Sequence, residues 1–221
     1  MLTVTAIGSA PHLAWFSQRL VGQGNTATPG PPPAGLPEWT GLCLGSLCID
    51  IADGLHWARQ ERAAQCHALG LDYVELAGPW QEQGTQWGFI LFVGGNETAL
   101  QRAKPLLDAL APLPGAWMHC GPAGAASFTA CVLAALSLPL AALPTLSPEL
   151  SPRAITDWQA ILSHQLETVR QLGILARDYL QSQGLREAPP SLSEPSPHYA
   201  ALLAQLLLAL ATPLDTAGDA P

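Results

Sequence analysis

The chain has 221 residues, of which 48% are hydrophobic and only 12% are charged, and its formal net charge is −8. This length allows one large domain or two small ones, and the composition is that of a folded protein. The acidic balance argues against nucleic acid or an anionic membrane surface as a partner, because both require clustered lysine and arginine.

The N-terminus has no basic segment followed by a long apolar run, so we expect no signal peptide. The two most apolar tracts, 128–143 and 199–211, are too short to span a bilayer, which takes roughly 18–20 apolar residues. We therefore expect a cytoplasmic protein with no membrane partner. The five cysteines form no CxxC motif, and we predict reduced thiols and no metal site.

The start of the chain predicts a strand, a helix and a linker. Residues 1–7 alternate β-branched and small side chains and predict a short strand, and the apolar spacing over 12–21 predicts a helix. Glycines at 22 and 24 are typical of a helix end. Residues 25–41 are rich in proline and glycine, and we predict a linker there.

From residue 44 onward, strands and helices alternate. Strands are predicted over 44–51, 72–77, 87–93 and 116–119, and helices over 53–69 and 97–111. We expect Arg59 and Arg62 on the polar face of the first of these helices. The alternation predicts an α/β fold with a reduced Rossmann-like parallel sheet and helices on both faces.

The remainder predicts a small all-α region. Small residues predict a helix over 123–138 that ends near Pro139. Serine–proline pairs at 151–152 and 196–197 are helix-start signals, for helices that run to about residues 182 and 210. The last helix is apolar almost all round, so we expect it to be buried in the fold or against another subunit.

These elements divide the chain into two predicted domains. Residues 1–120 form an incomplete Rossmann-like domain, in which the 25–41 linker replaces several elements, and residues 121–221 form a helical C-terminal domain.

Three passages carry a motif pattern. Residues 44–54 read LGSLCIDIADG, residues 88–105 read GFILFVGGNETALQRAKP, and residues 119–125 read HCGPAGA. In this order they resemble three motifs of the β-hydroxyacid dehydrogenases, most closely of the decarboxylating 6-phosphogluconate dehydrogenases. The last passage resembles the start of that family's long interdomain helix. The resemblance covers residues 45–138.

The resemblance extends to a cofactor-binding turn. The family has G-x-G-x-M-G after its first strand; here Gly8 takes the first glycine, while Ala10 and Leu13 stand at the other two. Glycines at these places let backbone amides approach a pyrophosphate. Gly8 is therefore the one cofactor-binding candidate. The resemblance implies NADP if any cofactor binds, and we expect none.

The family's proton-transfer groups are replaced. The resemblance implies a lysine, an asparagine and a glutamate on one face of the long helix, and these positions hold Ala130, Ala134 and Ser137. We therefore predict no catalytic residue. Of the substrate-facing positions, Gly84 and Gly124 survive as candidates.

These replacements favour a 6-phosphogluconate dehydrogenase-like protein that is catalytically inactive and acts in binding or assembly. Its expected partners are a second copy, through the C-terminal helices, or another protein. The alternative is an active NADP-dependent oxidoreductase that acts on a sugar acid or a 3-hydroxy acid. A third possibility, a decaying gene whose product does little, shares every sequence feature with the first.

Overall fold

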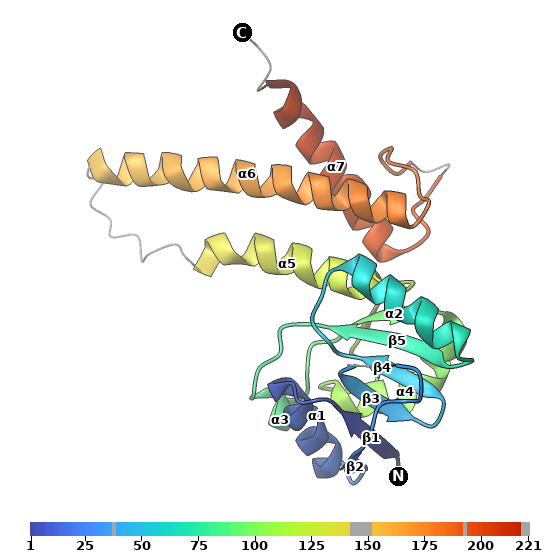
Figure 1. Cartoon of the computed structure of the whole chain (residues 1–221). Coiled ribbons are helices and arrows are strands. Elements are labelled where there is room, and N and C mark those ends of the chain that lie inside the picture. Colours follow the sequence, from blue (N-terminus) through green and yellow to red (C-terminus); the bar gives the residue numbers. More distant parts are fainter. Residues whose placement is uncertain (37–38, 142–151, 192–193, 218–221) are drawn as a thin grey trace. The chain divides into compact units, whose positions relative to one another are not determined.

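The computed structural model describes residues 1–36, 39–141, 152–191 and 194–217 (Figure 1). The chain divides into two compact units, Met1–Ala130 and Cys131–Pro221. The division lies within helix α5 (Ala125–Ala141), whereas the sequence places the domain boundary before this helix.

Within the described residues, the first unit is built on a seven-stranded sheet in the order β2-β1-β3-β4-β5-β6-β7. The strands are β1 (Thr3–Ile7), β2 (Thr26–Pro29), β3 (Gly41–Leu44), β4 (Leu47–Asp50), β5 (Asp72–Ala77), β6 (Phe92–Gly95) and β7 (Met118–Gly121). Strands β1, β2, β4 and β5 run in one direction, and the other three run in the opposite direction. The α/β class is confirmed, with a mixed sheet.

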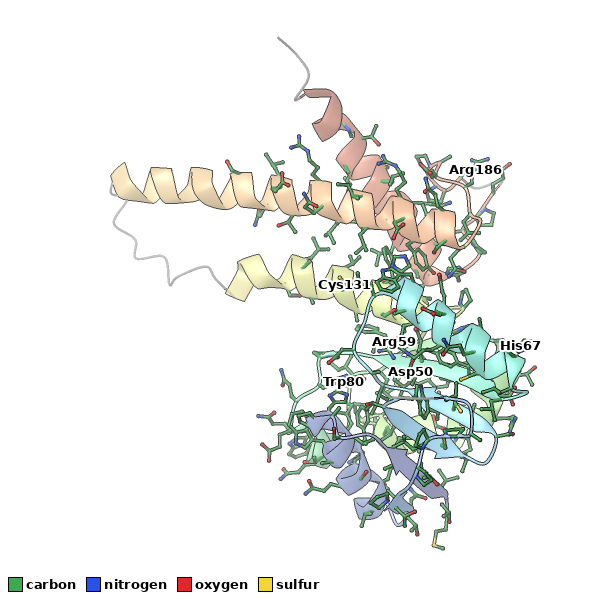
Figure 2. The ribbon with its side chains drawn as sticks, viewed as in Figure 1. Asp50, Arg59, His67, Trp80, Cys131 and Arg186 are labelled. Carbon is green, nitrogen blue, oxygen red and sulfur yellow. The ribbon has the colours of Figure 1, made fainter. Side chains whose placement is uncertain are left out.

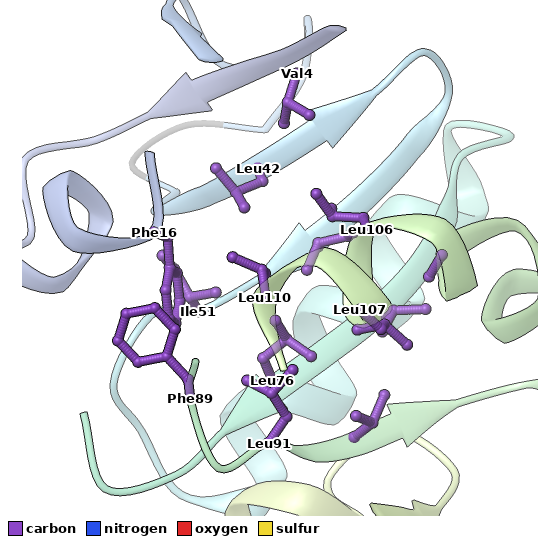
Figure 3. Close-up of a cluster of buried hydrophobic side chains, with 14 of the residues drawn as sticks. Val4, Phe16, Leu42, Ile51, Leu76, Phe89, Leu91, Leu106, Leu107 and Leu110 are labelled. Atoms are coloured by element: carbon purple, nitrogen blue, oxygen red, sulfur yellow. The ribbon is translucent and has the colours of Figure 1, made fainter. Parts of the chain in front are cut away.

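Helices cover both faces of this sheet, as predicted. Neighbouring strand residues point to opposite faces, so Leu42 and Ile49 enter one buried cluster while Cys43 and Cys48 enter another. The larger cluster (Figure 3) contains side chains of α1 (Pro11–Gly22) and α4 (Glu97–Leu110). The smaller cluster contains Cys66 of α2 (His56–Ala68).

Helix α4 illustrates how the sequence forms the helical layer on this face of the sheet. The Asn96 side chain accepts a hydrogen bond from the Ala99 amide at 2.8 Å and so caps the helix, a contribution of about 1 kcal/mol. Its inward face is apolar and fully buried: Leu100, Ala103, Leu106, Leu107 and Leu110. Burial of such a face, more than helix propensity, stabilises the element.

Two short strands were missed. The predicted linker contains β2, which pairs in parallel with β1, so the prediction of a structureless segment was wrong there. The predicted strand over 44–51 corresponds to β4, and the missed strand β3 before it pairs with β4 in a hairpin that turns at Gly45 and Ser46. Gly45 has φ +60°, which suits a two-residue hairpin turn.

The predicted strand over 87–93 begins too early. A short helix, α3 (Gly84–Trp87), ends at Gly88 with φ +87°. The Phe89 amide then donates to the Leu110 carbonyl at the end of α4, instead of to a neighbouring strand.

The second unit contains the rest of α5 with α6 (Pro152–Ser182) and α7 (Tyr199–Ala217). Helix α5 runs through Pro139 to Ala141, so the predicted end was a few residues short. The proline removes one helical hydrogen bond, and it lies close to the end of α5. Helices α6 and α7 pack closely, since a Cβ at Gly173 would lie 2.4 Å from the Ala211 Cβ. The predicted cap Ser151 lies outside the described residues.

In the described part of the chain, every helix is too short or too polar to cross a membrane.

Candidate functional site

Gly8 follows β1 in a left-handed conformation, with φ +93°. A Cβ at this position would lie 2.5 Å from Thr40 Oγ1 and 3.1 Å from Thr40 Cα. The first distance is shorter than real Cβ contacts and the second is tight, so a side chain at this position would require Thr40 to move. The neighbour that requires glycine here is therefore Thr40, a residue of the same chain.

The position of β3 explains why Thr40 lies beside Gly8. In doubly wound folds a dinucleotide binds outside the carboxyl ends of the strands, where the two halves of the sheet meet. Here β3 lies between the parallel pairs β2–β1 and β4–β5, and it runs antiparallel to both neighbours. Ile7 pairs with Gly41, so the amino end of β3 brings Thr40 to the carboxyl end of β1.

The first turn of α1 is also engaged by the protein. Pro11 at its start has no N–H to offer an anion. His12 is buried, and its Nε2 lies 3.1 Å from the Ile51 carbonyl oxygen. The Trp80 ring stacks on His12 with centroids 6.1 Å apart. The side chains at this turn therefore serve the packing of α1.

The end of β2 has none of the groups that read a ribose. In dinucleotide-binding folds this place holds a carboxylate for the 2′-hydroxyl or an arginine for the 2′-phosphate. Here Pro29 is followed by GPPPAGL, which contains no charged side chain. A Cβ at Gly30 would also lie 2.4 Å from Thr5 Cγ2. The residues at Gly8, Pro11 and Pro29 do not fit a dinucleotide bound in the Rossmann manner.

The start of α5 is capped by a buried acid. Glu75 on β5 is fully buried, and its Oε1 accepts from the amides of Ala126 at 2.5 Å and Ser127 at 3.2 Å. Burial raises the pKa of Glu75, while Arg59 and the amides at the start of α5 oppose this shift. A carboxylate is a favourable partner for a helix N-terminus. Glu75 thus holds the turn that the HCGPAGA motif forms.

Gly124 belongs to the same turn, with φ +92°. A Cβ there would lie 3.0 Å from the His56 carbonyl oxygen and 3.1 Å from the Gln60 side chain. The close approach of α2 accounts for glycine at this position. A substrate-binding role for Gly124 stays a prediction.

The hydroxyl groups of α5 bond to their own helix. Ser127 Oγ donates to the Gly124 carbonyl, Thr129 Oγ1 to that of Ala125, and Ser137 Oγ to that of Leu133, at 3.1, 2.8 and 2.7 Å. Ala130 and Ala134 carry no polar group. The positions that correspond to the family's lysine, asparagine and glutamate thus carry no acid, base or amide side chain.

Gly84 lies buried at the start of α3. A Cβ there would lie 2.2 Å from the Phe89 ring, so glycine is required by packing. Trp80, in the loop before it, meets the Phe16 ring edge-to-face at 4.9 Å. This loop therefore packs on the core, and a substrate role for Gly84 stays a prediction.

A buried ionic cluster, absent from the sequence predictions, surrounds Asp50 at the end of β4 (Figure 2). Its carboxylate pairs with Arg59 Nη1 at 2.7 Å and Arg62 Nε at 2.6 Å. It also accepts from the Tyr73 hydroxyl at 2.6 Å and the Ala52 amide at 2.9 Å. The sequence places Arg59 on the polar face of its helix, and at this position the side chain is only 3% exposed, because it neutralises Asp50.

Arg59 joins this cluster to Glu75. Burial acts to lower the pKa of Arg59, but the charges of Asp50 and Glu75 outweigh it and raise the pKa. Arg59 Nη2 also donates to the Leu76 carbonyl at 3.3 Å. The signal that would have found this cluster is an aspartate at a buried strand end followed by two arginines three residues apart on the next helix.

In the described residues, no group of three or more His, Cys, Asp or Glu side chains is arranged to hold a metal ion. The ionic cluster therefore ties α2 to β4 and β5 through protein groups alone. The Asp50 carboxylate pairs with both arginines, while Arg59 Nε and Arg62 Nη2 are buried without a hydrogen-bond partner among the described residues.

The chain matches no protein-family model and no curated protein sequence. Among solved structures it is similar to a V8 variant of an imine reductase from Myxococcus stipitatus in complex with NAD+. That alignment has 12% identity and a TM-score of 0.51, and it covers 99% of this chain and 95% of the reductase.

Two 3-hydroxyisobutyrate dehydrogenases are also similar. The structure of the Mycobacterium tuberculosis enzyme with L-serine is 18% identical to this chain, with a TM-score of 0.48. The alignment covers 100% of this chain and 90% of the dehydrogenase chain. The enzyme from Salmonella typhimurium has 15% identity and a TM-score of 0.45, and the alignment covers 99% of this chain and 95% of the dehydrogenase chain. At such identities a likeness concerns the fold alone, and it is the imine reductase that supports the Rossmann-like fold.

Proposed function

We propose that this protein is a 6-phosphogluconate dehydrogenase-like scaffold that has lost catalysis and acts by binding or assembly. The observation that carries the proposal is the antiparallel strand β3, which brings Thr40 against Gly8 at the carboxyl end of β1. In a dinucleotide-binding turn the first glycine permits the tight turn that brings the following residues to the pyrophosphate, and Thr40 packs against that glycine here.

The start of α5 supports the same proposal. Glu75, Ser127 and Thr129 are buried and hydrogen-bonded to the backbone, and Ala130 and Ala134 follow on the helix. Loss of one general base typically lowers a rate by about 10²–10⁴-fold. Here the positions of the family's lysine, asparagine and glutamate all lack such a group.

The second candidate is an active NADP-dependent oxidoreductase that acts on a sugar acid or a 3-hydroxy acid. Strand β2 favours it, because the β1–α1–β2 unit is more complete than the sequence indicates. The left-handed Gly8 after β1 favours it as well. The similar imine reductase is in complex with NAD+.

A turnover assay separates the two candidates. The purified full chain is incubated with NADP+ and either 6-phosphogluconate or 3-hydroxyisobutyrate, and NADPH is followed by absorbance. We expect no turnover above a heat-denatured sample. Turnover that disappears when Gly8 is replaced by aspartate would establish the oxidoreductase and overturn the scaffold.

For the scaffold, we propose a homodimer formed through α7 in the cytoplasm. One face of α7 is buried, and the opposite face carries the exposed apolar side chains Tyr199, Leu202, Leu206 and Leu210. Their spacing of three and four residues places them on one stripe. The Leu210 side chain is 63% exposed, and a contiguous apolar stripe of this kind is typical of a protein interface.

A further inference from the structure

Three cysteines come together in the smaller buried cluster of the first unit. Cys43 lies on β3, Cys48 on β4 and Cys66 on α2, and all three are free thiols. The sequence separates them without any disulfide or metal motif. The proposed function does not use them.

Cys43 and Cys48 have the geometry of a cross-strand disulfide pair. They stand directly opposite each other in the antiparallel β3–β4 hairpin. Residues in this relation have Cα atoms about 4.5–5.5 Å apart, and disulfides accept Cα separations of about 4.4–6.8 Å. The two sulfur atoms are 3.9 Å apart, so side-chain rotation can close the bond without a change of strand register.

Hydrogen bonds with Cys43 and Cys66 make Cys48 the reactive thiol of the three. Hydrogen bonds from Cys43 and then from Cys66 lower the pKa of Cys48, against the opposing effects of burial and Asp50. The pKa of Cys43 is raised by its bond to Cys48 and by burial. Because the thiolate is the nucleophile, Cys48 attacks first. Cys43, at 8% exposed the only one of the three above 0%, marks the side from which a small oxidant approaches.

We propose that Cys43 and Cys48 form a redox-active dithiol that hydrogen peroxide converts to a disulfide across the β3–β4 hairpin. The Cys48 thiolate attacks one peroxide oxygen, the O–O bond breaks, and a sulfenic acid and hydroxide form. The Cys43 sulfur then attacks the Cys48 sulfur, the S–O bond breaks, and the oxygen leaves as water with the Cys43 proton. The hydroxide takes up the proton that Cys48 released on ionisation, so two thiols are oxidised and one peroxide becomes two waters.

Tryptic mapping of the full chain tests this proposal directly. Cleavage after arginine places Cys43 and Cys48 in one peptide, 20–59, Cys66 in peptide 63–102, and Cys120 and Cys131 in peptide 103–153. The reduced protein is treated with increasing peroxide, denatured, alkylated at its remaining thiols and digested. Mass spectrometry then counts the alkylated cysteines in each peptide.

We expect peptide 20–59 to lose both alkylation sites together, before either other peptide changes. Its mass should then be that of the unalkylated dithiol peptide less two hydrogens. Reduction with dithiothreitol restores both sites. The Cys66→Ser variant still forms the bond, but more slowly, whereas Cys48→Ser does not form it. Cys131→Ser, at the most exposed cysteine, leaves the bond and its rate unchanged.

Three results would overturn the proposal. The first is a disulfide that links peptides 20–59 and 63–102, since Cys66 would then be the partner. The second is loss of alkylation at Cys131 before any change at Cys43 and Cys48. The third is an intact pair of thiols in peptide 20–59 when peroxide already oxidises methionine in the same sample.

Discussion

Gly8 and Gly24 both have positive φ angles, but only Gly8 has a close neighbour. The φ angles are +93° and +76°, and a Cβ at Gly24 would meet nothing within 4 Å. For alanine, a left-handed conformation costs roughly 1–2 kcal/mol. At Gly8 the contact with Thr40 adds an overpacking cost of about 1–3 kcal/mol.

We therefore expect Gly8→Ala to lower the free energy of unfolding by more than Gly24→Ala does. Urea denaturation of the two variants and the wild type measures the difference. Equal losses for the two variants would show that Thr40 does not lie against Gly8 in solution.

Glu75 makes stability depend on pH. Its pKa is raised in the folded protein by burial, so the folded state binds the proton more tightly than the unfolded state does. This contribution is fully present below the ordinary glutamate pKa of about 4.3 and is lost as pH rises through the folded pKa. Glutamine keeps an oxygen for the Ala126 and Ser127 amides but does not titrate.

The free energy of unfolding of wild type should thus fall relative to Glu75→Gln as pH rises from about 4.3, and then level off. Urea titrations of both proteins across this pH range provide the measurement. A difference that stays constant, or that changes in favour of wild type, would mean that Glu75 is not buried as described.

Asp50 connects three elements, because its partners lie on α2 and β5 while it belongs to β4. Its removal leaves Arg59 buried without its counterion, and breaking such a buried pair typically costs about 3–5 kcal/mol. We expect a loss of this size for Asp50→Asn. The control is Glu167→Gln, whose exposed pair with Arg170 is worth about 1 kcal/mol or less. Similar small losses for both variants, measured by urea denaturation, would refute the role given to Asp50.

The elements that the sequence predicts well have long, regular patterns. Strand β5 and helices α4 and α6 agree with their predicted ranges to within a residue or two at the described ends, because an apolar stripe identifies each helix and glycines at 70 and 78 bound the strand. Strand β2 has four residues and ends in proline, so its sequence carries no strand signal. The sheet beside it, not the local pattern, makes it a strand.

Of the candidate site, too, the sequence predicts one part and not another. Replacement of the proton-transfer groups at Ala130 and Ala134 can be read from the motif, since these residues follow HCGPAGA at fixed spacing. The contact of Thr40 with Gly8 cannot be read in this way, and the spacing of Asp50, Arg59 and Arg62 indicates an ionic pair without fixing its geometry. Both contacts depend on the direction of β3 and the rotation of α2, which only the folded sheet determines.

For the molecule as a whole, the stripe on α7 predicts the oligomeric state. Sedimentation equilibrium of the wild type at micromolar concentration should give a dimer. Leu206→Glu puts a charge in the centre of the stripe and should give a monomer. Leu113→Glu, at a more exposed leucine of the first unit, should remain a dimer. A monomeric wild type would exclude assembly through α7.

The most direct test of the scaffold proposal is dinucleotide binding by the full chain. NADP+ and NAD+ are titrated to millimolar concentration while the melting temperature and tryptophan fluorescence are followed. A ligand at one hundred times its Kd stabilises a protein by about 2.7 kcal/mol, which raises the melting temperature of a chain of this size by several degrees. We expect no shift with either cofactor, because Thr40 packs against Gly8 in the turn after β1 and the end of β2 has no group that reads a ribose. A saturable shift with a sub-millimolar Kd would contradict a closed site.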